Sequence, residues 1–427
     1  MSTNPRQALN QRVLIGIQTA VNTPIHATKQ LPMSVIDFSP QAEYAVSIAA
    51  GKRISTQVNL TKEWSNITVG GKCDYNDLAY WGSSMFDYAA PTGSNEFTWV
   101  MDSNMTCKDE SKLMSIWKGS CVRGDYLHDA QVQSMSLTFG NGGIDKNISM
   151  IGKEVEHGVT QLELEITGTP TGGTFIITYN SHETSALTFD DTASDIQAAL
   201  IALDDFSTGD VECWGGPMTS AVVYILIKKN DFITASSFTT SDSLTAGTDP
   251  ASAISAPTET RVAVEEIVRG QVSIYFADTQ ATLGAATAAV RNLSATFNYN
   301  NKVNPLFVLN ADYSDSYKEA VETAADIGLS FSVAADSEGE AYFETMRDGD
   351  TKFMRIEAVG PVIGADGGGT SALTYKFTGD FAFQINAAPS FEDMDGLYAN
   401  TWGGVIVDDA TWGKGYCITL VNALSAL

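Results

Sequence analysis

The sequence predicts a mainly β protein into which a small α+β module is inserted. Apolar and polar residues alternate with period two through most of the chain, which is the pattern of strands with one buried face. Residues 131–156 and 262–300 both show this alternation, whereas residues 160–257 between them differ in composition. Helical patterns are few. Together these features predict a β-sandwich body, one flanking helix and an autonomous insert.

The strands of the body are predicted from alternation around turn signals. Asn141-Gly142-Gly143 is flanked by alternating residues on both sides, so residues 131–150 are expected to form a hairpin. Residues 371–386 alternate in the same way and are expected to form a second hairpin, with a bend or bulge at Gly379. A further hairpin is expected to turn at Asp348-Gly349. Two long polar stretches are predicted to be loops or extended arms: residues 87–130 and 360–370.

Three segments of the body are predicted to be helical. Residues 316–328 combine a capping pair, Ser316 and Glu319, with apolar residues on one face and a glycine stop. A short helix is expected over 75–86, and a single helical turn within 390–400. The first of these segments is the one long helix that we expect to pack on the sandwich.

The insert is predicted to run strand–strand–helix–strand–strand. Thr192 and Asp195 form a capping signal for its helix. Its four predicted strands are 172–180, 183–189, 210–214 and 221–229. The segment 243–260 is rich in Ser, Thr, Ala and Pro and is predicted to be a polar linker. We therefore divide the chain into a discontinuous core, 1–159 with 258–427, and an outward-facing decoration domain, 160–257, that folds on its own.

The composition narrows the possible partners. The 427 residues include 25 basic and 51 acidic ones, a net charge of −26, which argues against holding nucleic acid by phosphate neutralisation. The charge is uneven: residues 1–159 carry 13 basic and 15 acidic groups, and residues 160–257 carry 2 and 13. No apolar run approaches the ~20 residues of a membrane-spanning helix. The N-terminus lacks the apolar core of a signal peptide, so synthesis in a cytoplasm is expected.

No pattern in the sequence predicts catalysis, a metal or a cofactor. The four histidines share no metal-ligand spacing, and the known nucleophile and zinc-protease motifs are absent. Adjacent acids are expected to be solvated caps of turns and helices: Asp190-Asp191, Asp204-Asp205 and Asp408-Asp409. The five scattered cysteines are interpreted as free thiols, with a Cys107–Cys121 pair left open. We therefore expect a structural protein, not an enzyme.

Several segments, taken in order, resemble the major tail tube proteins of long-tailed bacteriophages. The opening VLIGIQTAVNTPIHATKQLPMSVIDFSP resembles that family's start, with Gln18 where an acid usually stands and Asn22 near the usual glycine. GGKCDYNDLAYWGSSMF, MSLTFGNGGIDKNISMIGK and IVRGQVSIYFADTQATLGAATAAVRNLSATFNYN are similar to later segments of the family. The insert is similar to a small module that recurs in phage structural proteins.

The resemblance implies a subunit that assembles with itself into stacked rings, usually hexameric. Each subunit lends strands to an inner barrel through which the genome DNA passes without tight binding. The resemblance also implies tape measure, tail terminator and tail tip proteins as partners, and a location in the virion tail after assembly in the host bacterial cytoplasm. Candidate acidic residues of the lumen or of the contact between rings are Asp348, Asp350 and Asp380.

One alternative function remains open at this stage. A carbohydrate- or cell-binding surface protein would use exposed aromatic side chains, and the insert contains four candidates: Phe175, Tyr179, Trp214 and Tyr224. These residues also fall at alternating strand positions, which favours core packing.

Overall fold

The structure is a computed structural model of the chain. It describes residues 12–50, 52–86, 90–94, 96–103, 111–120, 124–219, 221–229, 233–289, 292–310, 316–323, 325–365, 372–387, 389–394 and 396–427. Cys107 and Cys121, whose pairing the sequence left open, lie outside these residues, whereas Cys73, Cys213 and Cys417 are free thiols.

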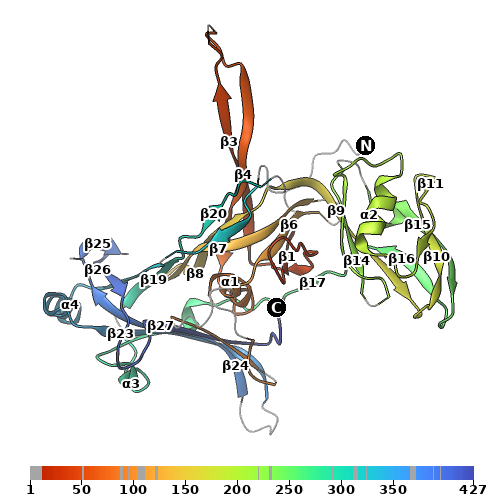
Figure 1. The fold of residues 1–427 in the computed structure, drawn as a ribbon. Coiled ribbons are helices and arrows are strands. Elements are labelled where there is room, and N and C mark those ends of the chain that lie inside the picture. Colours follow the sequence, from red (N-terminus) through yellow and green to blue (C-terminus); the bar gives the residue numbers. More distant parts are fainter. Residues whose placement is uncertain are drawn as a thin grey trace.

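The body is built mainly from two antiparallel sheets (Figure 1). The first sheet has the strand order β3-β4-β8-β7-β19-β22-β26-β25. Its strands are β3 (Val35–Ser47), β4 (Gln57–Lys72), β8 (Gly143–Gly152), β7 (Gly124–Gly140), β19 (Asn292–Asn300), β22 (Asp326–Ala334), β26 (Leu397–Ile406) and β25 (Ser390–Met394). The second sheet has the order β18-β23-β24-β27-β5. Its strands are β18 (Val272–Ala277), β23 (Lys352–Ala365), β24 (Ala372–Ile385), β27 (Tyr416–Asn422) and β5 (Phe97–Asp102).

The two sheets enclose one large hydrophobic core. Aromatic rings of the first sheet meet those of β24 across the interior, with Phe297 and Phe381 4.8 Å apart between ring centroids and Phe331 and Phe383 5.6 Å apart. These residues are buried because alternation places every second side chain of each strand on the inner face. The mainly β prediction is therefore confirmed.

The remaining elements of the body lie at the rim of this sandwich. A smaller sheet joins β2 (Lys29–Gln30), β1 (Arg12–Ile17), β6 (Met114–Gly119) and the first residues of β7, with β17 (Thr260–Arg261) parallel to β2. The others are β20 (Asn304–Leu306), β21 (Glu319–Val321), the four-residue α3 (Gln280–Leu283) and a 3-10 turn at Arg269–Gln271.

The helices confirm one prediction and correct another. Helix α1 (Asp77–Met85) lies where residues 75–86 predicted it. The long helix, α4, spans Ser337–Asp348 and not 316–328, so the hairpin expected to turn at Asp348-Gly349 is also wrong. Apolar side chains of α4 recur at helical spacing and pack on the core.

The segment 316–328 contains strands β21 and the start of β22 instead of a helix. Its apparent capping residue has other partners, since the Ser316 hydroxyl donates to Glu154 Oε2 at 2.8 Å. Tyr317 is 1% exposed and donates from its hydroxyl to the Asp129 carbonyl. Tertiary contacts thus override the local helix signal.

Three smaller predictions are also corrected. The range 371–386 contains the single strand β24 (Ala372–Ile385) instead of a hairpin, and this strand pairs with β23 without a register shift at Gly379. The shifts lie in the partner strand, after Val359. Residues 390–400 form the hairpin β25–β26 and not a helical turn. The stretch 87–130 contains β5, β6 and the start of β7, which pair with β27, β1 and each other.

The insert contains the predicted helix and strands in three of the four predicted ranges, whereas the predicted strand 183–189 is divided into the two short strands β11 and β12. Helix α2 (Ala193–Ile201) begins at Thr192, whose hydroxyl accepts from Asp195 in a complete capping box. The strands are β9 (Glu156–Thr167), β10 (Gly172–Tyr179), β11 (His182–Glu183), β12 (Leu187–Thr188), β13 (Val211–Gly215), β14 (Val223–Ile227), β15 (Phe238–Thr245) and β16 (Ala251–Ser255), with a 3-10 turn at Ala235–Ser237. The segment 243–260 is therefore not a linker, since the end of β15 and all of β16 pair with β10 and β9.

Strand β9 connects the body to the insert. Its residues Glu156 and Val159 face β7 of the body, whereas from Thr160 onward it pairs with β14 of the insert. The insert has its own hydrophobic core, drawn from residues between Leu162 and Phe238. It lies to one side of the body (Figure 1). Whether the segment 160–257 folds on its own stays a prediction.

Candidate functional site

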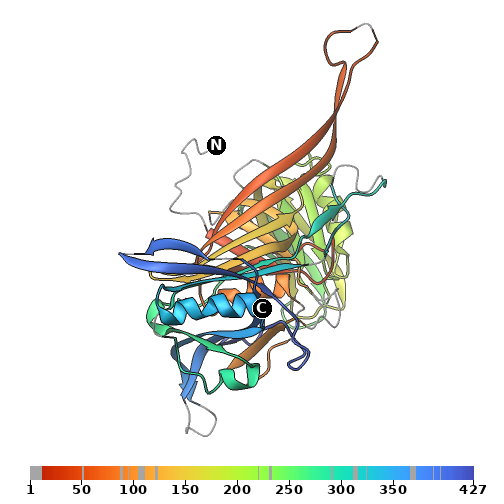
Figure 2. The ribbon, with the colours of Figure 1, turned by 90° about the vertical axis from the view of Figure 1, so that its left-hand side faces the viewer.

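The most prominent feature of the molecule is a long hairpin that projects from the body (Figures 1 and 2). It is formed by β3 and β4, which pair from Val35 opposite Gly70 to Ser47 opposite Gln57. Strand β4 pairs with β8 only from Ser65 onward. Beyond that point the hairpin is a two-stranded ribbon, and its outer part, residues 44–60, is called the arm below.

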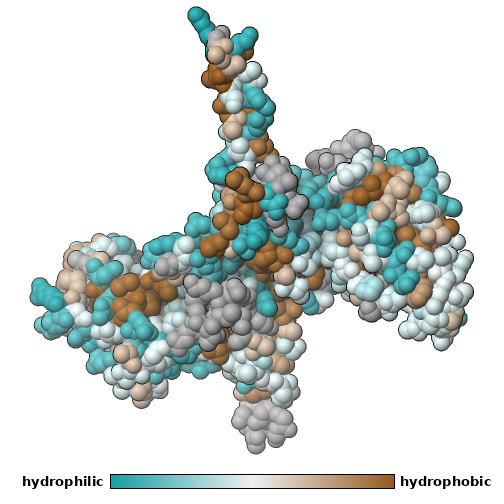
Figure 3. Space-filling view, in the orientation of Figure 1, coloured by the Kyte–Doolittle hydropathy of each residue, from teal (hydrophilic) through white to brown (hydrophobic). Residues whose placement is uncertain are grey.

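The surface of the arm is apolar and basic. Five large apolar side chains of the arm are 57–76% exposed: Tyr44, Val46, Ile48, Ile54 and Val58. Figure 3 shows hydrophobic residues spread along its length. The sequence of the arm contains Lys52 and Arg53 but no acidic residue, although the whole chain carries −26. An isolated two-stranded ribbon is marginally stable in water, so this surface is suited to a partner.

The arm does not follow from the sequence patterns described above. Tyr44, Val46 and Ile48 alternate with small residues, and this alternation was the available signal. Pro40 within β3 and the absence of an Asn-Gly or Asp-Gly turn between the strands weakened it.

A second exposed hairpin lies at the opposite edge of the first sheet. Strand β25 pairs with β26 alone among the described strands. The rings of Phe391 and Tyr398 stack with centroids 5.6 Å apart, although these side chains are 55% and 65% exposed. Leu397 beside them is 55% exposed. An unpaired edge with exposed aromatic residues is a typical site of strand pairing between chains.

The three acidic residues predicted from the sequence lie in different environments. Asp380 is 7% exposed, and its two carboxylate oxygens accept from the Arg355 guanidinium at 2.6 and 2.8 Å. Its charge is therefore compensated within the chain. Asp348 and Asp350 are exposed at the end of α4, and their position in a lumen stays a prediction.

The opening motif forms a buried polar network. Gln18 and Asp129 exchange two hydrogen bonds, from Gln18 Nε2 to Asp129 Oδ1 at 2.9 Å and from Asp129 N to Gln18 Oε1 at 2.7 Å. Burial alone would raise the pKa of Asp129, but His128, Lys153 and Gln18 outweigh it and lower the pKa. An acid at position 18 would place a second carboxylate against Asp129, so the amide suits this site.

Asn22 shows why a glycine fits near this place in the motif. Its φ of +55° lies in the left-handed region that glycine adopts without strain and Asn tolerates better than most residues. The Asn22 amide N–H donates to Asp129 at 3.1 Å, which holds the loop in this conformation.

Two of the four aromatic residues of the alternative function lie in the core of the insert, and the other two lie where it meets the body. Phe175 is 1% and Tyr179 8% exposed. The rings of Trp214 and Tyr224 stack, and both contact the buried His26 ring of the body at centroid distances of 5.3 and 4.9 Å. The four side chains therefore do not form a common exposed platform for a sugar.

His26 is a buried titratable group at this junction. Its Nδ1 lies 3.8 Å from Glu163 Oε1, too far for a hydrogen bond. Burial lowers its pKa, and the Glu163 carboxylate opposes this effect only in part.

A buried ion pair fastens α1 to the first sheet. The Lys146 side chain of β8 is 0% exposed and contacts Asp77 Oδ2, whose side chain is 2% exposed. The Lys146 ammonium also donates to the Lys72 carbonyl at 3.0 Å, and the Ser34 hydroxyl donates to Asp77 at 3.3 Å. Burial raises the pKa of Asp77 to about 6, although Lys146 lowers it.

The paired acids serve local structure. Asp191 accepts from the Thr188 amide at 2.8 Å, and Asp409 accepts from the amides of Thr411 and Trp412. Within the described residues, no three His, Cys, Asp or Glu side chains gather as metal ligands would. No helix in this part of the chain is long and apolar enough to span a membrane.

Comparison with known proteins adds little to these observations. No family model matches the chain, and no curated protein matches it. Among solved structures, the chain is similar to one from Mycobacterium phage Patience, with 15% identity and a TM-score of 0.18. The similarity covers 31% of this chain and about half, 49%, of the phage chain.

Proposed function

We propose that this chain is the structural subunit of a phage tail tube, which assembles with itself into stacked, six-membered rings. The observation that carries the proposal is the arm, a two-stranded ribbon with five exposed apolar side chains and, among the described residues, no partner strand beyond its own hairpin. A strand of 13 residues such as β3 spans about 40 Å, which is long enough to reach a neighbouring molecule.

Charge favours a second copy of the same chain as the partner of the arm. The arm is basic, and the rest of the chain has a large excess of acid. Opposite charges steer association and select the partner. Among the described strands, the outer edges of β25 and β3 provide further sites for pairing between copies, and closing such edges removes surfaces that would otherwise aggregate.

In this proposal DNA passes through the ring without tight binding. A chain with 51 acidic and 25 basic residues lacks a dense phosphate-binding track. The exposed Asp348 and Asp350 are proposed to line the lumen or the contact between rings, whereas Asp380 is not proposed again because Arg355 compensates its charge. Tape measure, terminator and tail tip proteins are the proposed partners in the virion tail, on the basis of the sequence resemblance. No catalytic role is proposed.

Electron microscopy of the purified chain over a range of concentrations tests the proposal. Wild-type protein is expected to form rings or tubes. A matched variant replaces residues 43–62 by Asn-Gly, a two-residue turn that joins Ala42 to its cross-strand partner Glu63. We expect this variant to remain folded but to lose the stacking of rings into tubes.

A second variant serves as the control. Replacing residues 160–257 by a short Gly/Ser bridge removes a much longer segment than the first variant does. We nevertheless expect this control to form tubes. Wild-type protein that stays monomeric at every concentration and salt would contradict the tube function. Duplex DNA should show no measurable micromolar affinity for the tubes at physiological salt, in contrast to ordinary non-specific binders at roughly 1–100 μM.

A further inference from the structure

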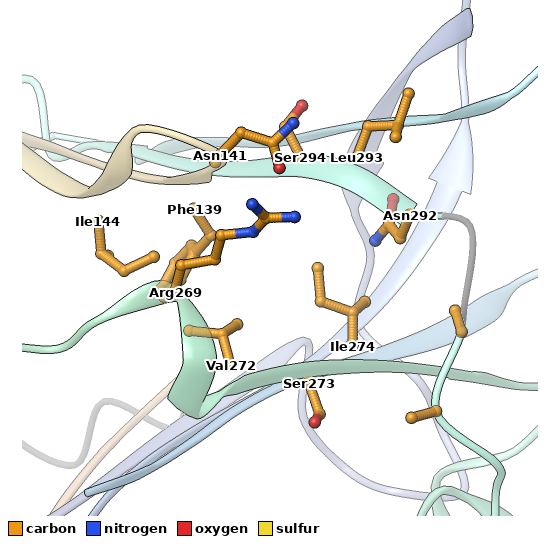
Figure 4. A pocket seen from close by; sticks show the side chains of 13 residues that line it. Phe139, Asn141, Ile144, Arg269, Val272, Ser273, Ile274, Asn292, Leu293 and Ser294 are labelled. Atoms are coloured by element: carbon orange, nitrogen blue, oxygen red, sulfur yellow. The ribbon is translucent and has the colours of Figure 1, made fainter. Parts of the chain in front are cut away.

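A cavity of about 230 Å³ opens between the two sheets of the body, beside the β7–β8 turn (Figure 4). One wall is apolar and is formed by Phe139, Ile144, Val272 and Ile274. Polar side chains of Asn141, Arg269, Asn292 and Ser294 also line it. A cavity of about 150 Å³ with aliphatic walls is sufficient for a benzene ring, so this one has room for an aromatic side chain.

Asn292 is a polar side chain of the cavity that lacks a hydrogen-bond partner within the described part of the chain. Both amide atoms of the Asn292 side chain are buried without a hydrogen bond. A buried amide without partners destabilises the fold, and such a group in a native protein requires an explanation. The Arg269 side chain extends into the cavity (Figure 4) and has no ion-pair partner among the described residues.

These groups define the chemistry of an occupant. The apolar wall favours an aromatic or aliphatic side chain, and the Arg269 guanidinium favours a carboxylate. The free amide of Asn292 can both donate to and accept from a peptide group. The matching ligand is an extended peptide with an aromatic residue and an acid on the same face.

We propose that this cavity binds the β25–β26 hairpin of a second copy of this chain, with Phe391 in the apolar part and Asp393 against Arg269. The inference rests on the proposed self-assembly and names one contact of it. Phe391 and Asp393 are two residues apart on a strand, so their side chains share a face about 7 Å apart. Phe391 is 55% exposed and therefore available.

The acid of this pair retains a free oxygen for the contact. Asp393 Oδ1 accepts from the Gly396 amide at 2.8 Å, which fixes the carboxylate and leaves Oδ2 for an external donor. A charged contact next to a buried aromatic anchor is typical of the centre of a protein interface. Because the chain is strongly acidic, most surfaces of two copies repel each other. The basic Arg269 therefore favours contact with an acidic side chain at this one place.

Charge reversal followed by charge exchange tests the contact. Arg269→Glu and Asp393→Arg should each raise the concentration for half-maximal assembly about tenfold, measured by sedimentation velocity. The double variant restores the opposite charges in exchanged positions and should return to within about threefold of wild type. Recovery of assembly in the double variant would show that the single variants fail because of their charges and not because they misfold.

A second pair of variants tests the aromatic anchor. Phe391→Ala should weaken assembly about tenfold or more, whereas Leu309→Ala, which removes a fully exposed apolar side chain elsewhere, should not. The inference is overturned if the single charge variants assemble like wild type, or if the double variant assembles as poorly as they do. In that case wild-type tubes would still support the proposed function, whereas wild-type protein that never assembles overturns both.

Discussion

The buried ion pair between Lys146 and Asp77 gives the most quantitative prediction. Replacing Lys146 by Met keeps the length of the side chain but leaves the Asp77 carboxylate, 2% exposed, without its cation. Removing one partner of a buried pair costs about 3–5 kcal/mol. The other contacts of the carboxylate do not compensate, since among the described residues only the Ser34 hydroxyl also donates to Oδ2 and Oδ1 has no partner.

The stability that Lys146→Met loses relative to wild type should increase with pH. Lys146 lowers the pKa of Asp77, so its removal raises that pKa further above the already raised value of about 6. An acid with a raised pKa in the folded state stabilises the fold below its unfolded pKa, and this stability is lost as the pH rises through the folded pKa. The deficit of Lys146→Met should therefore be larger at about pH 8 than at about pH 5.

Chemical unfolding monitored by tryptophan fluorescence measures this prediction. Lys62→Met is the matched control, because Lys62 is 40% exposed and its pair with Glu43 is expected to contribute about 0–1 kcal/mol. The double variant Lys146→Met/Asp77→Leu should recover much of the lost stability, since an apolar pair can replace a buried ion pair. A loss below about 1 kcal/mol, or an equal loss at both pH values, would refute the reasoning.

Three further predictions concern the junction, the insert and the opening motif. Because burial lowers the pKa of His26, acidification below about pH 6.5 should destabilise the wild type, and His26→Phe should flatten this dependence in thermal unfolding scans; an unchanged slope would contradict it. Thr192→Ala should destabilise the insert by about 1 kcal/mol in denaturant unfolding, whereas no effect would show that the cap is dispensable. Asn22→Ala should be less stable than Asn22→Gly by about 1–2 kcal/mol because of the positive φ, and equal stabilities would contradict this reason.

Local patterns in the sequence predicted the elements whose stability is mostly local. The hairpin around Asn141-Gly142-Gly143, the helix α1 and the capping box of α2 each depend on residues close together in the chain. Period-two alternation predicted the mainly β class, because it depends only on which side chains face a core. The insert differs from the body in composition, and this difference is also visible in the sequence alone.

Tertiary structure decided the features that depend on distant partners. Ser316 has the local signature of a helix cap, but Glu154 and the burial of Tyr317 place this segment at the edge of a sheet. Asp380 pairs with Arg355, 25 residues away on the neighbouring strand, and this partner could not be read from the sequence around it. Residues close together in the chain do not reveal how distant strands align, and this alignment brings such side chains into contact.

The arm and the cavity show the same division. The sequence by itself determined that the protein is acidic and mainly β, and that a capped module interrupts it, because these properties follow from composition and short-range periodicity. Only the tertiary structure decided that residues 44–60 extend beyond the sheet and that Asn292 lies unpaired beside Arg269. Both features depend on where neighbouring strands end, which is set by pairing between segments far apart in the chain.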